Sequence, residues 1–217
     1  MIVVTGSPGA GKSTVAAALV ARFEPSVLVV GHASFGFVAH GAIEPWLPES
    51  HGQNDVVISA AAAATGAFAA GRYATVYDGV VGPWFLDASL RRTGLESINY
   101  PVLLPSKDEC VRRVATRLGH GFTDEPATRK MHREFSAAPI ASRHVITSDE
   151  RNVEETVGEI LDRLDRDELR HARSAGSTPR LSCQGSALEG HRRARTGLGT
   201  VAAGPSQSGE VSEVASS

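Results

Sequence analysis

The sequence contains few cysteines, few aromatic residues and no long apolar run. Only Cys110 and Cys183 are present among its 217 residues, and their spacing matches neither a metal site nor a redox pair. Cys110 falls in an expected helix, where a small buried thiol is the ordinary interpretation. Cys183 falls in a segment that is expected to be disordered.

A membrane segment is also missing from the sequence. No stretch of about 18 or more apolar residues is uninterrupted by charges or turn residues, so no membrane-spanning helix is expected. The N-terminus has no basic segment and leads at once into an expected strand. No signal peptide is therefore expected, and the cytoplasm is the expected compartment.

Charge of one sign does not dominate either. The chain has 22 Lys and Arg against 24 Asp and Glu, a formal net charge of −2. A nucleic-acid partner recognised through bulk electrostatics is therefore not expected, whereas a small anion needs only a local site. With 41% hydrophobic residues, the chain is long enough for one well-buried α/β domain.

The most specific pattern present is GSPGAGKST, residues 6–14, which matches G-x-x-x-x-G-K-[ST]. It lies between a short β-branched run and an Ala-rich helical stretch, so backbone N–H groups at a helix N-terminus can bind phosphate oxygens. We expect Lys12 to reach the β- and γ-phosphates and the Ser13 hydroxyl to ligate Mg²⁺. The predicted nucleotide-binding residues here are Gly6, Ser7, Pro8, Gly9, Ala10, Gly11, Lys12, Ser13 and Thr14.

Apolar runs alternate with helical patterns along residues 1–166, which is typical of an α/β domain with a parallel sheet between helices. Strands are expected over residues 2–5, 27–31, 74–79, 98–104 and 144–147. Helices are expected over residues 12–23, 34–40, 54–70, 84–93, 106–118, 125–136 and 152–166. Residues 167–217 have little periodicity and much Gly, Ser and Ala, so a disordered tail is expected there.

Two classes of nucleotide hydrolase are not favoured by the sequence. The guanine-binding N-K-x-D of GTPase switches is missing, because the segment after the last expected strand reads TSDERN, residues 147–152. Motor and remodelling ATPases usually have a larger core and a strand that ends in Asp-Glu. Here the nearest segment, TVYDG, has a lone Asp78. One domain over residues 1–166 has the size of a small-molecule kinase.

A lid is expected at about residues 117–128, because a kinase must keep water away from the phosphoryl group that moves. Arg113 and Arg117 lie four residues apart at the end of an expected helix, hence on one face. A loop with Gly119 and Gly121 follows. Arg113 is predicted to stack on adenine and Arg117 to neutralise charge on the transferring group. The alternative is an ordinary solvated basic helix end.

Four segments together resemble the small bacterial P-loop phosphotransferases, the kinase group that includes chloramphenicol phosphotransferase, shikimate kinase and gluconate kinase. They are the P-loop, GAIEPWLPESHGQN (41–54), VYDGVVGPWFL (76–86) and RVATRLGHGFTDE (113–125). The resemblance covers about residues 1–165 and implies a P-loop NTPase fold. That fold is a three-layer α/β sandwich with a five-stranded parallel sheet of order 2-3-1-4-5, a short lid, and an acceptor pocket at the strands' C-terminal edge.

The resemblance also implies roles for residues at the ends of two strands. Asp78 would hold Mg²⁺ through water or orient the acceptor, although Asp followed by Gly is also a common strand-end turn. Many relatives have Asp at the end of the second strand, where this chain reads Gly31-His32-Ala33-Ser34. Three interpretations stay open: His32 is a substitute base, it only contacts substrate, or it is inert and activity is weakened.

An acceptor pocket is expected between residues 35–54 and the helix after the third strand. The predicted substrate contacts are Phe35, Trp46, Asn54 and Trp84, and the same segments also offer Phe37, His51, Gln53 and Phe85. Core packing is the alternative for the phenylalanines, and a surface or turn position for His51. Aromatic walls with few basic residues favour a neutral, partly apolar alcohol over a strongly anionic acceptor.

These features predict ATP-dependent transfer of the γ-phosphoryl group to a hydroxyl of a small molecule, with ATP and Mg²⁺ as cofactors. Two alternatives remain, an ATP-binding regulatory protein with little or no catalysis and an acceptor-independent ATPase. We expect a small-molecule partner, no nucleic acid and no membrane, and a monomer or homodimer. The predicted catalytic residues are Lys12, Asp78, Arg117 and His32; Ser13 and Asp78 are the predicted metal ligands, and Arg113 completes the nucleotide site.

Overall fold

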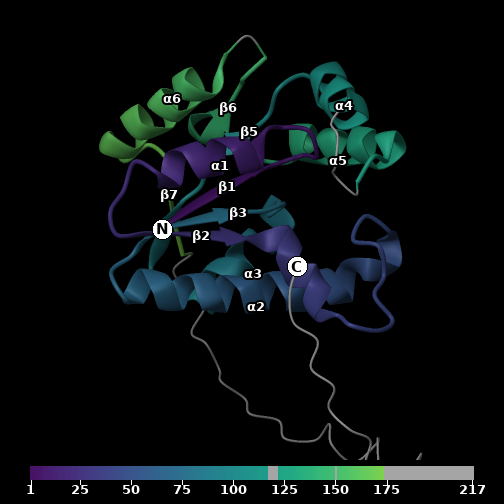
Figure 1. Ribbon diagram of the computed structural model, residues 1–217, viewed down its shortest axis with the longest axis horizontal. Helices are drawn as coiled ribbons and strands as arrows, with labels where there is room; N and C mark the ends of the chain where they lie inside the picture. Colours follow the sequence, from purple (N-terminus) through teal and green to yellow (C-terminus); the bar gives the residue numbers. More distant parts are fainter. Residues whose placement is uncertain (117–121, 150, 174–217) are drawn as a thin grey trace, which may run out of the picture. The chain divides into compact units, whose positions relative to one another are not determined.

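A sheet of short strands forms the middle layer of the computed structural model, which describes residues 1–116, 122–149 and 151–173 (Figure 1). β2, β3 and β1 are parallel neighbours, β1 also pairs in parallel with β4 and β5, and β5 pairs in parallel with β6. The strands are β1 (Ile2–Gly6), β2 (Ser26–Val30), β3 (Ala74–Asp78), β4 (Ser97–Asn99), β5 (Val102–Leu103), β6 (Val145–Ile146) and β7 (Arg170–Ala172).

The predicted strand order 2-3-1-4-5 is confirmed, with the fourth predicted strand divided into β4 and β5. The division falls at Pro101, which has no N–H group for a strand ladder; its carbonyl accepts the Thr5 N–H at 3.1 Å. β7 is an additional strand, antiparallel to β4. It lies beyond the predicted domain end at residue 166, in a polar segment whose pattern predicts no strand. The ordered chain therefore extends at least through β7.

Helices cover both faces of the sheet. α1 and α6 lie on one face, and α2 and α3 on the other (Figure 1). α4 and α5 pack against each other. The helices are α1 (Lys12–Val20), α2 (His51–Ala70), α3 (Pro83–Thr93), α4 (Lys107–Thr116), α5 (Glu125–Ala137) and α6 (Val153–Asp165), with 3₁₀ turns η1 (Gly31–Phe37), η2 (Pro48–Ser50) and η3 (Ser142–His144).

The strands bury both of their faces, which explains their almost continuous apolar runs. Val4, Val76 and Leu103 belong to the core under α1 and α6. Their neighbours along the strands, Val3, Tyr77 and Val102, belong to the opposite core with α2, α3 and Phe135 of α5. The period of two along each strand assigns successive side chains to opposite layers.

The predicted helix over residues 34–40 is wrong, because the chain forms the 3₁₀ turn η1 directly after β2. The two glycines in this segment, Gly31 and Gly36, disfavour an α-helix. Gly31 also packs so closely on Tyr77 that a Cβ would lie 2.3 Å from the tyrosine oxygen. Within the described part of the chain, no helix has the length and hydropathy of a membrane span.

Candidate active site

The P-loop joins β1 to α1 and needs glycine at specific points. Gly9 has φ +78°, and a Cβ at this position would lie 2.2 Å from the carbonyl oxygen of Cys110 in α4. Gly11 has φ +91° and precedes the first residue of α1. Left-handed backbone costs little only for glycine, and the close approach to α4 leaves no room for a side chain. The loop is therefore shaped by its glycines and packed onto α4.

The N-terminus of α1 presents its backbone donors to a ligand. Among the described residues, no side chain caps this helix, so its first N–H groups are available for phosphate oxygens. The Lys12 ammonium donates to the Ser7 carbonyl at 2.9 Å, which holds the side chain over the loop. Ser13 and Thr14 are exposed on the first turn.

Asp78 and His32 lie at the same edge of the sheet as the P-loop. β3 lies between β1 and β2, and Asp78 is in register with Val4 of β1 and Val30 of β2. Asp78 ends β3 and is 2% exposed, whereas His32 follows β2 within η1 and is exposed. The carboxyl ends of parallel strands thus bring the carboxylate and the imidazole to the phosphate-binding edge.

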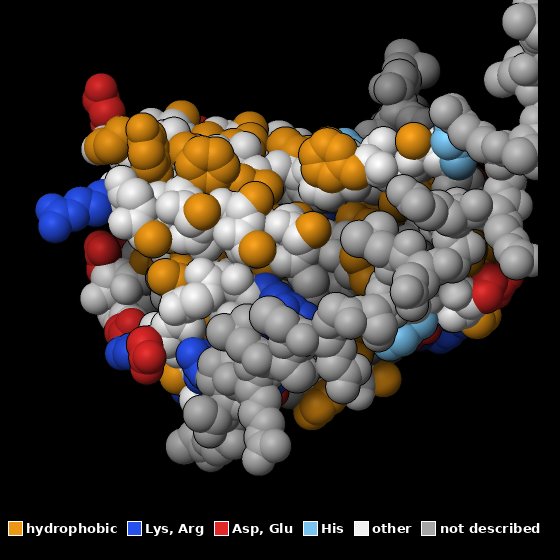
Figure 2. Space-filling view, turned by 90° about the horizontal axis from the view of Figure 1, so that it is seen from below, with side chains coloured by type: hydrophobic (Ala, Val, Ile, Leu, Met, Phe, Trp, Pro, Cys, Tyr) orange, Lys and Arg blue, Asp and Glu red, His pale blue; other side chains and the backbone are white. Residues whose placement is uncertain are grey.

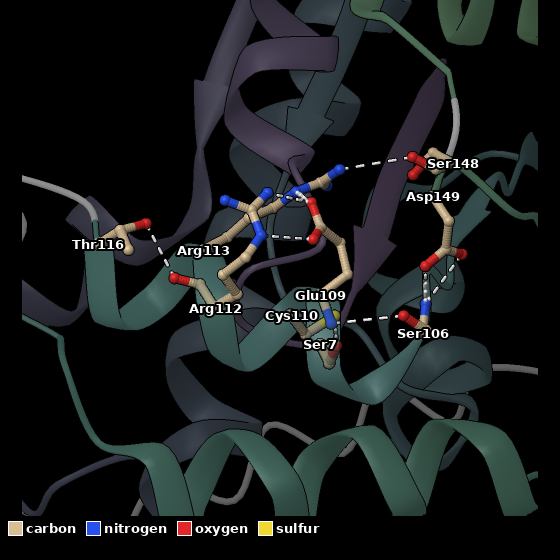
Figure 3. A network of polar contacts seen from close by, with 9 residues as sticks. All are labelled: Ser7, Ser106, Glu109, Cys110, Arg112, Arg113, Thr116, Ser148 and Asp149. Atoms are coloured by element: carbon tan, nitrogen blue, oxygen red, sulfur yellow. Dashed lines mark hydrogen bonds and ion pairs between the residues drawn. The ribbon is translucent and has the colours of Figure 1, made fainter.

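Arg113 of α4 lies beside the P-loop, held by Glu109 (Figure 3). Its Nε donates to the Glu109 carboxylate at 2.6 Å and its Nη2 to the Ser148 carbonyl at 3.4 Å. A Cβ on Gly11 would lie 3.5 Å from Arg113 Nη1, so the guanidinium is next to the loop. Hydrogen bonds from Arg112, and then from Arg113, lower the pKa of Glu109 to about 2, although burial opposes them. Glu109 is therefore ionised at neutral pH.

The contact between the P-loop and α4 also includes Cys110, whose sulfur lies 3.4 Å from the Ser7 hydroxyl. Burial raises the pKa of the Cys110 thiol, so the side chain stays a neutral packing group, as the sequence predicts. Nearby, the Asp149 carboxylate accepts the Ser106 N–H at 2.8 and 3.0 Å, which ties the segment after β6 to the start of α4 (Figure 3).

One cavity of about 750 Å³ joins the P-loop to a largely apolar compartment. On the phosphate side it is lined by P-loop residues and Arg113, and on the other side by aromatic residues from η1, the segment before α2, and α3. The predicted site residues that line it are Pro8, Gly9, Gly11, Lys12, Ser13, Thr14, His32, Phe35, Trp46, Asn54, Asp78, Trp84 and Arg113.

The aromatic compartment is built from edge-to-face and stacked rings. Trp46 meets Phe122 edge to face with ring centroids 4.9 Å apart, and His51 stacks on Phe85 at 5.1 Å. Such pairs add packing energy beyond simple burial. Asn54 shapes the segment before α2, since its Nδ2 donates to the Pro45 carbonyl at 2.7 Å.

Some of the predicted site residues do not line this cavity. Gly6, Ser7 and Ala10 are buried beneath the loop rather than on the cavity surface. Phe37, considered for the pocket or for the core, belongs to neither, because its side chain is 85% exposed. The Gln53 amide pairs with the Ile43 backbone and is not part of the lining. Arg117 and the rest of residues 117–121 of the predicted lid, and the predicted tail after Arg173, lie outside the described residues.

Other cavity residues are not singled out by the sequence patterns. Phe122 precedes α5, and Lys130, Met131 and Glu134 lie on α5 itself. The available signal is helical spacing: Ala127, Lys130, Met131 and Glu134 recur every three or four residues and therefore share one face.

No protein-family model and no curated protein sequence matches this chain. Solved structures do. A gluconokinase from Sinorhizobium meliloti aligns with a TM-score of 0.55 at 20% identity over 77% of this chain and 92% of its own. A sugar kinase from Janibacter sp. aligns at 0.58 with 19% identity, covering 76% and 93%, and a tunicamycin resistance protein from Deinococcus radiodurans at 0.57 with 13%, covering 75% and 94%.

The chain has the fold of the P-loop kinases. The alignments span nearly the whole of each neighbour, so the likeness extends beyond the phosphate-binding loop to the helices that line the cavity. At 13–20% identity it concerns the fold alone. What each neighbour phosphorylates or resists is a property of that neighbour.

Proposed function

We propose that this protein is an ATP-dependent phosphotransferase that moves the γ-phosphoryl group to a hydroxyl of a small, uncharged, partly apolar molecule. The observation that carries the proposal is the single cavity in which a P-loop and an aromatic compartment meet at Asp78 and His32. A protein that only hydrolyses ATP needs space for water beside the γ-phosphate. A compartment with aromatic walls is suited to an organic acceptor.

The transfer needs a few groups at this junction. The acceptor oxygen forms a bond to the γ-phosphorus while the bond from that phosphorus to the β,γ-bridging oxygen breaks, and ADP leaves. Lys12, the N–H groups of α1 and Arg113 stabilise charge on the phosphates. The acceptor hydroxyl loses its proton to Asp78 or His32, the two groups at the strand ends that can accept one.

A magnesium ion fits the residues at this edge. Ser13 supplies a hydroxyl and Asp78 a carboxylate, both lining the same cavity, and hard oxygen ligands are those that Mg²⁺ prefers. When bound, the ion would neutralise charge on the β- and γ-phosphates. Asp78 is 2% exposed, so a nearby cation would compensate the charge of its buried carboxylate.

The acceptor class follows from the charges of the lining. Apart from Lys12 and Arg113 at the phosphate end, the cationic side chain among the described lining residues is Lys130. Glu134 lies one turn further along α5 and lines the same wall. A site with balanced charge does not select a strongly anionic acceptor, and aromatic walls favour a ring-bearing alcohol.

His32 supports a second candidate function. Because no carboxylate follows β2, where the P-loop phosphotransferases often have Asp, the chain could bind ATP without efficient transfer, as a regulatory protein does. Phosphoryl transfer depends mainly on positioning and charge neutralisation, so a weak base slows the reaction without abolishing it. We therefore favour the enzyme.

The test is ADP production with Mg²⁺ and ATP against a panel of uncharged ring-bearing alcohols, nucleosides and sugars, with shikimate and gluconate as anionic comparisons. One uncharged acceptor should raise turnover, and Lys12→Ala should lower that turnover by about 100-fold. Lys107→Ala, on an exposed side chain of α4, should leave it unchanged.

Three other outcomes would count against the proposal. Saturable transfer to shikimate or gluconate would overturn the acceptor class. ATP binding without stimulation by any acceptor, even in His32→Asp, would favour the regulatory protein. Phosphate release that no acceptor changes would indicate an ATPase.

A further inference from the structure

The outer surface of α2 is apolar over four turns. Its exposed side chains from Val56 onward are hydrophobic, and residues 56–71 contain no charged residue. A surface helix ordinarily presents charged side chains to water. The α2 face is defined by Val56, Ala60, Ala63, Ala64, Ala67 and Phe68, all exposed.

Larger aromatic side chains extend this surface. Phe68 is 44% exposed and meets Tyr73, also 44% exposed, edge to face at 6.2 Å. η1 packs on α2 and carries Phe37, 85% exposed at its end. Figure 2 looks onto the α2 and α3 layer and shows hydrophobic side chains in a band across its upper part, with most charges at the margins.

The apolar area exposed on these elements is large for a monomer. The exposed fractions of Phe37, Val56, Phe68 and Tyr73, together with the exposed alanines, correspond to roughly 700 Å². The largest apolar patch on a typical monomer is about 300–600 Å². A stable protein interface buries about 800 Å² on each partner. The α2 surface is therefore close to the area of one half of an interface.

We propose that this surface binds a second copy of the same chain, α2 against α2, to form a two-fold symmetric dimer. A two-fold contact places the same patch on both sides, and an uncharged patch brings no like charges together when it meets itself. Charged groups are what an interface uses to choose a different partner. The α2 face carries none between the exposed Asp55 and Arg72, which lie at its two ends. The chemistry of the α2 face therefore favours a second copy of the same chain as its partner.

The spacing along α2 suits a helix pair. Val56, Ala60, Ala63 and Ala67 follow one another at intervals of four, three and four residues, which is the spacing of a two-helix seam. The alanines at its centre allow the two helices to approach closely, and Val56 and Phe68 lie toward its ends. The opposite side of α2 is already used, since Ala61, Ala62 and Thr65 are buried in the protomer.

The two elements at the proposed dimer interface, α2 and η1, also line the cavity. α2 contributes Asn54 and Ile58 to the lining, and η1 contributes His32 and Phe35. Both elements also carry the exposed surface. The proposal does not depend on the proposed function, because its test measures molar mass and not activity.

The experiment is light scattering after gel filtration, and sedimentation velocity, on the full chain at micromolar concentrations. The wild type should have twice the 22.8 kDa of one chain. Ala63→Glu, at the centre of the seam, should have the mass of one chain. Ala17→Glu is the matched control, an exposed alanine of α1 on the other side of the sheet, and should stay dimeric.

A second variant covers the case in which Ala63→Glu fails to fold. Phe37→Ser changes a side chain that is 85% exposed in the protomer, so folding should be unaffected while dimer dissociation rises by about tenfold or more. A wild type with the mass of one chain at every concentration would overturn the proposal. So would a dimer that both folded variants leave intact, since the contact would then lie elsewhere.

Discussion

Gly9 shows how one residue can be required by both backbone and packing. Its φ of +78° lies in the left-handed region, and the carbonyl oxygen of Cys110 occupies the place that a side chain would take. Either fact alone disfavours alanine, and together they connect the P-loop motif to the position of α4. The motif's glycine is therefore explained by this structure and not only by the pattern.

We expect Gly9→Ala to lower the free energy of unfolding by about 2 kcal/mol or more and to weaken ATP binding. Denaturant unfolding and nucleotide titration measure the two effects. The control is Gly158→Ala in α6, where a Cβ meets nothing within 4 Å; it should stabilise by about 0.5–1 kcal/mol. Equal effects of the two variants would contradict this account.

A substitution at Asp78 tests whether the carboxylate at the end of β3 takes part in phosphoryl transfer. Asp78→Asn keeps the shape of the side chain but removes its charge, so we expect kcat to fall by about 100-fold with little change in ATP affinity without metal. Steady-state kinetics and ATP titration with and without Mg²⁺ provide the measurement. Asp165→Asn, exposed at the end of α6, is the matched control. Unchanged kcat in Asp78→Asn would exclude a role in transfer.

At the scale of elements, α4 links the P-loop to the segment after β6. Glu109 holds both Arg112 and Arg113, and Arg113 also donates to the Ser148 carbonyl. The Arg113 side chain is 29% exposed and that of Glu109 18%. A partly buried ion pair of this kind fixes the direction of the guanidinium more than it adds to stability.

Glu109→Gln should therefore raise the KM for ATP by about 3–10-fold while kcat changes little, because the charge that orients Arg113 is lost. Arg113→Ala should raise the KM at least as much, and the double variant should add little to it. The comparison variant is Glu125→Gln, which breaks the exposed Glu125–Arg129 pair on α5 and should not change the KM. Additive effects of the Glu109 and Arg113 changes would show that the two residues act separately.

At the scale of the whole molecule, His144 connects segments that are far apart in the chain. It is 4% exposed, and its ring meets Tyr100 at 5.8 Å and His171 of β7 at 6.4 Å. Burial, together with the nearby charges of Arg143 and His171, lowers the pKa of His144 to about 4. The folded protein thus favours the neutral imidazole.

The lowered pKa of His144 predicts that the free energy of unfolding decreases with acid over a defined range of pH. Between the ordinary pKa of 6.5 and about 4, the unfolded chain binds a proton at this histidine that the folded chain does not. Stability should therefore fall as pH drops through that window, by on the order of 2–3 kcal/mol, and not further below it. Denaturant unfolding of the wild type and His144→Gln from pH 8 to 4 measures the slopes.

The slope in the variant should be smaller between pH 6.5 and 4, and the two slopes should agree above pH 7. The depressed pKa of Glu109, about 2, acts in a lower window, because its stabilisation is present above pH 4.5 and is lost as pH falls toward 2. Parallel slopes for the two proteins below pH 6.5 would contradict the burial of a neutral His144.

Local chemistry and periodicity were enough to predict the P-loop, the parallel sheet and the position of Asp78 at a strand end. These features depend on neighbouring residues: a glycine-rich turn, a β-branched run, a helix N-terminus. The sheet order came from the family resemblance and is confirmed. The roles of the site residues stay predictions that the proposed experiments address.

Tertiary structure alone decided which distant segments meet. α5 contributes Lys130, Met131 and Glu134 to the cavity, and β7 pairs with β4 from a segment whose own pattern predicts no strand. The side chain of Phe37 is exposed to solvent, although an aromatic residue suits a pocket or a core. A side chain's type sets what contacts it favours, but the docking of elements far apart in sequence sets which contacts exist, because burial depends on the whole chain's packing.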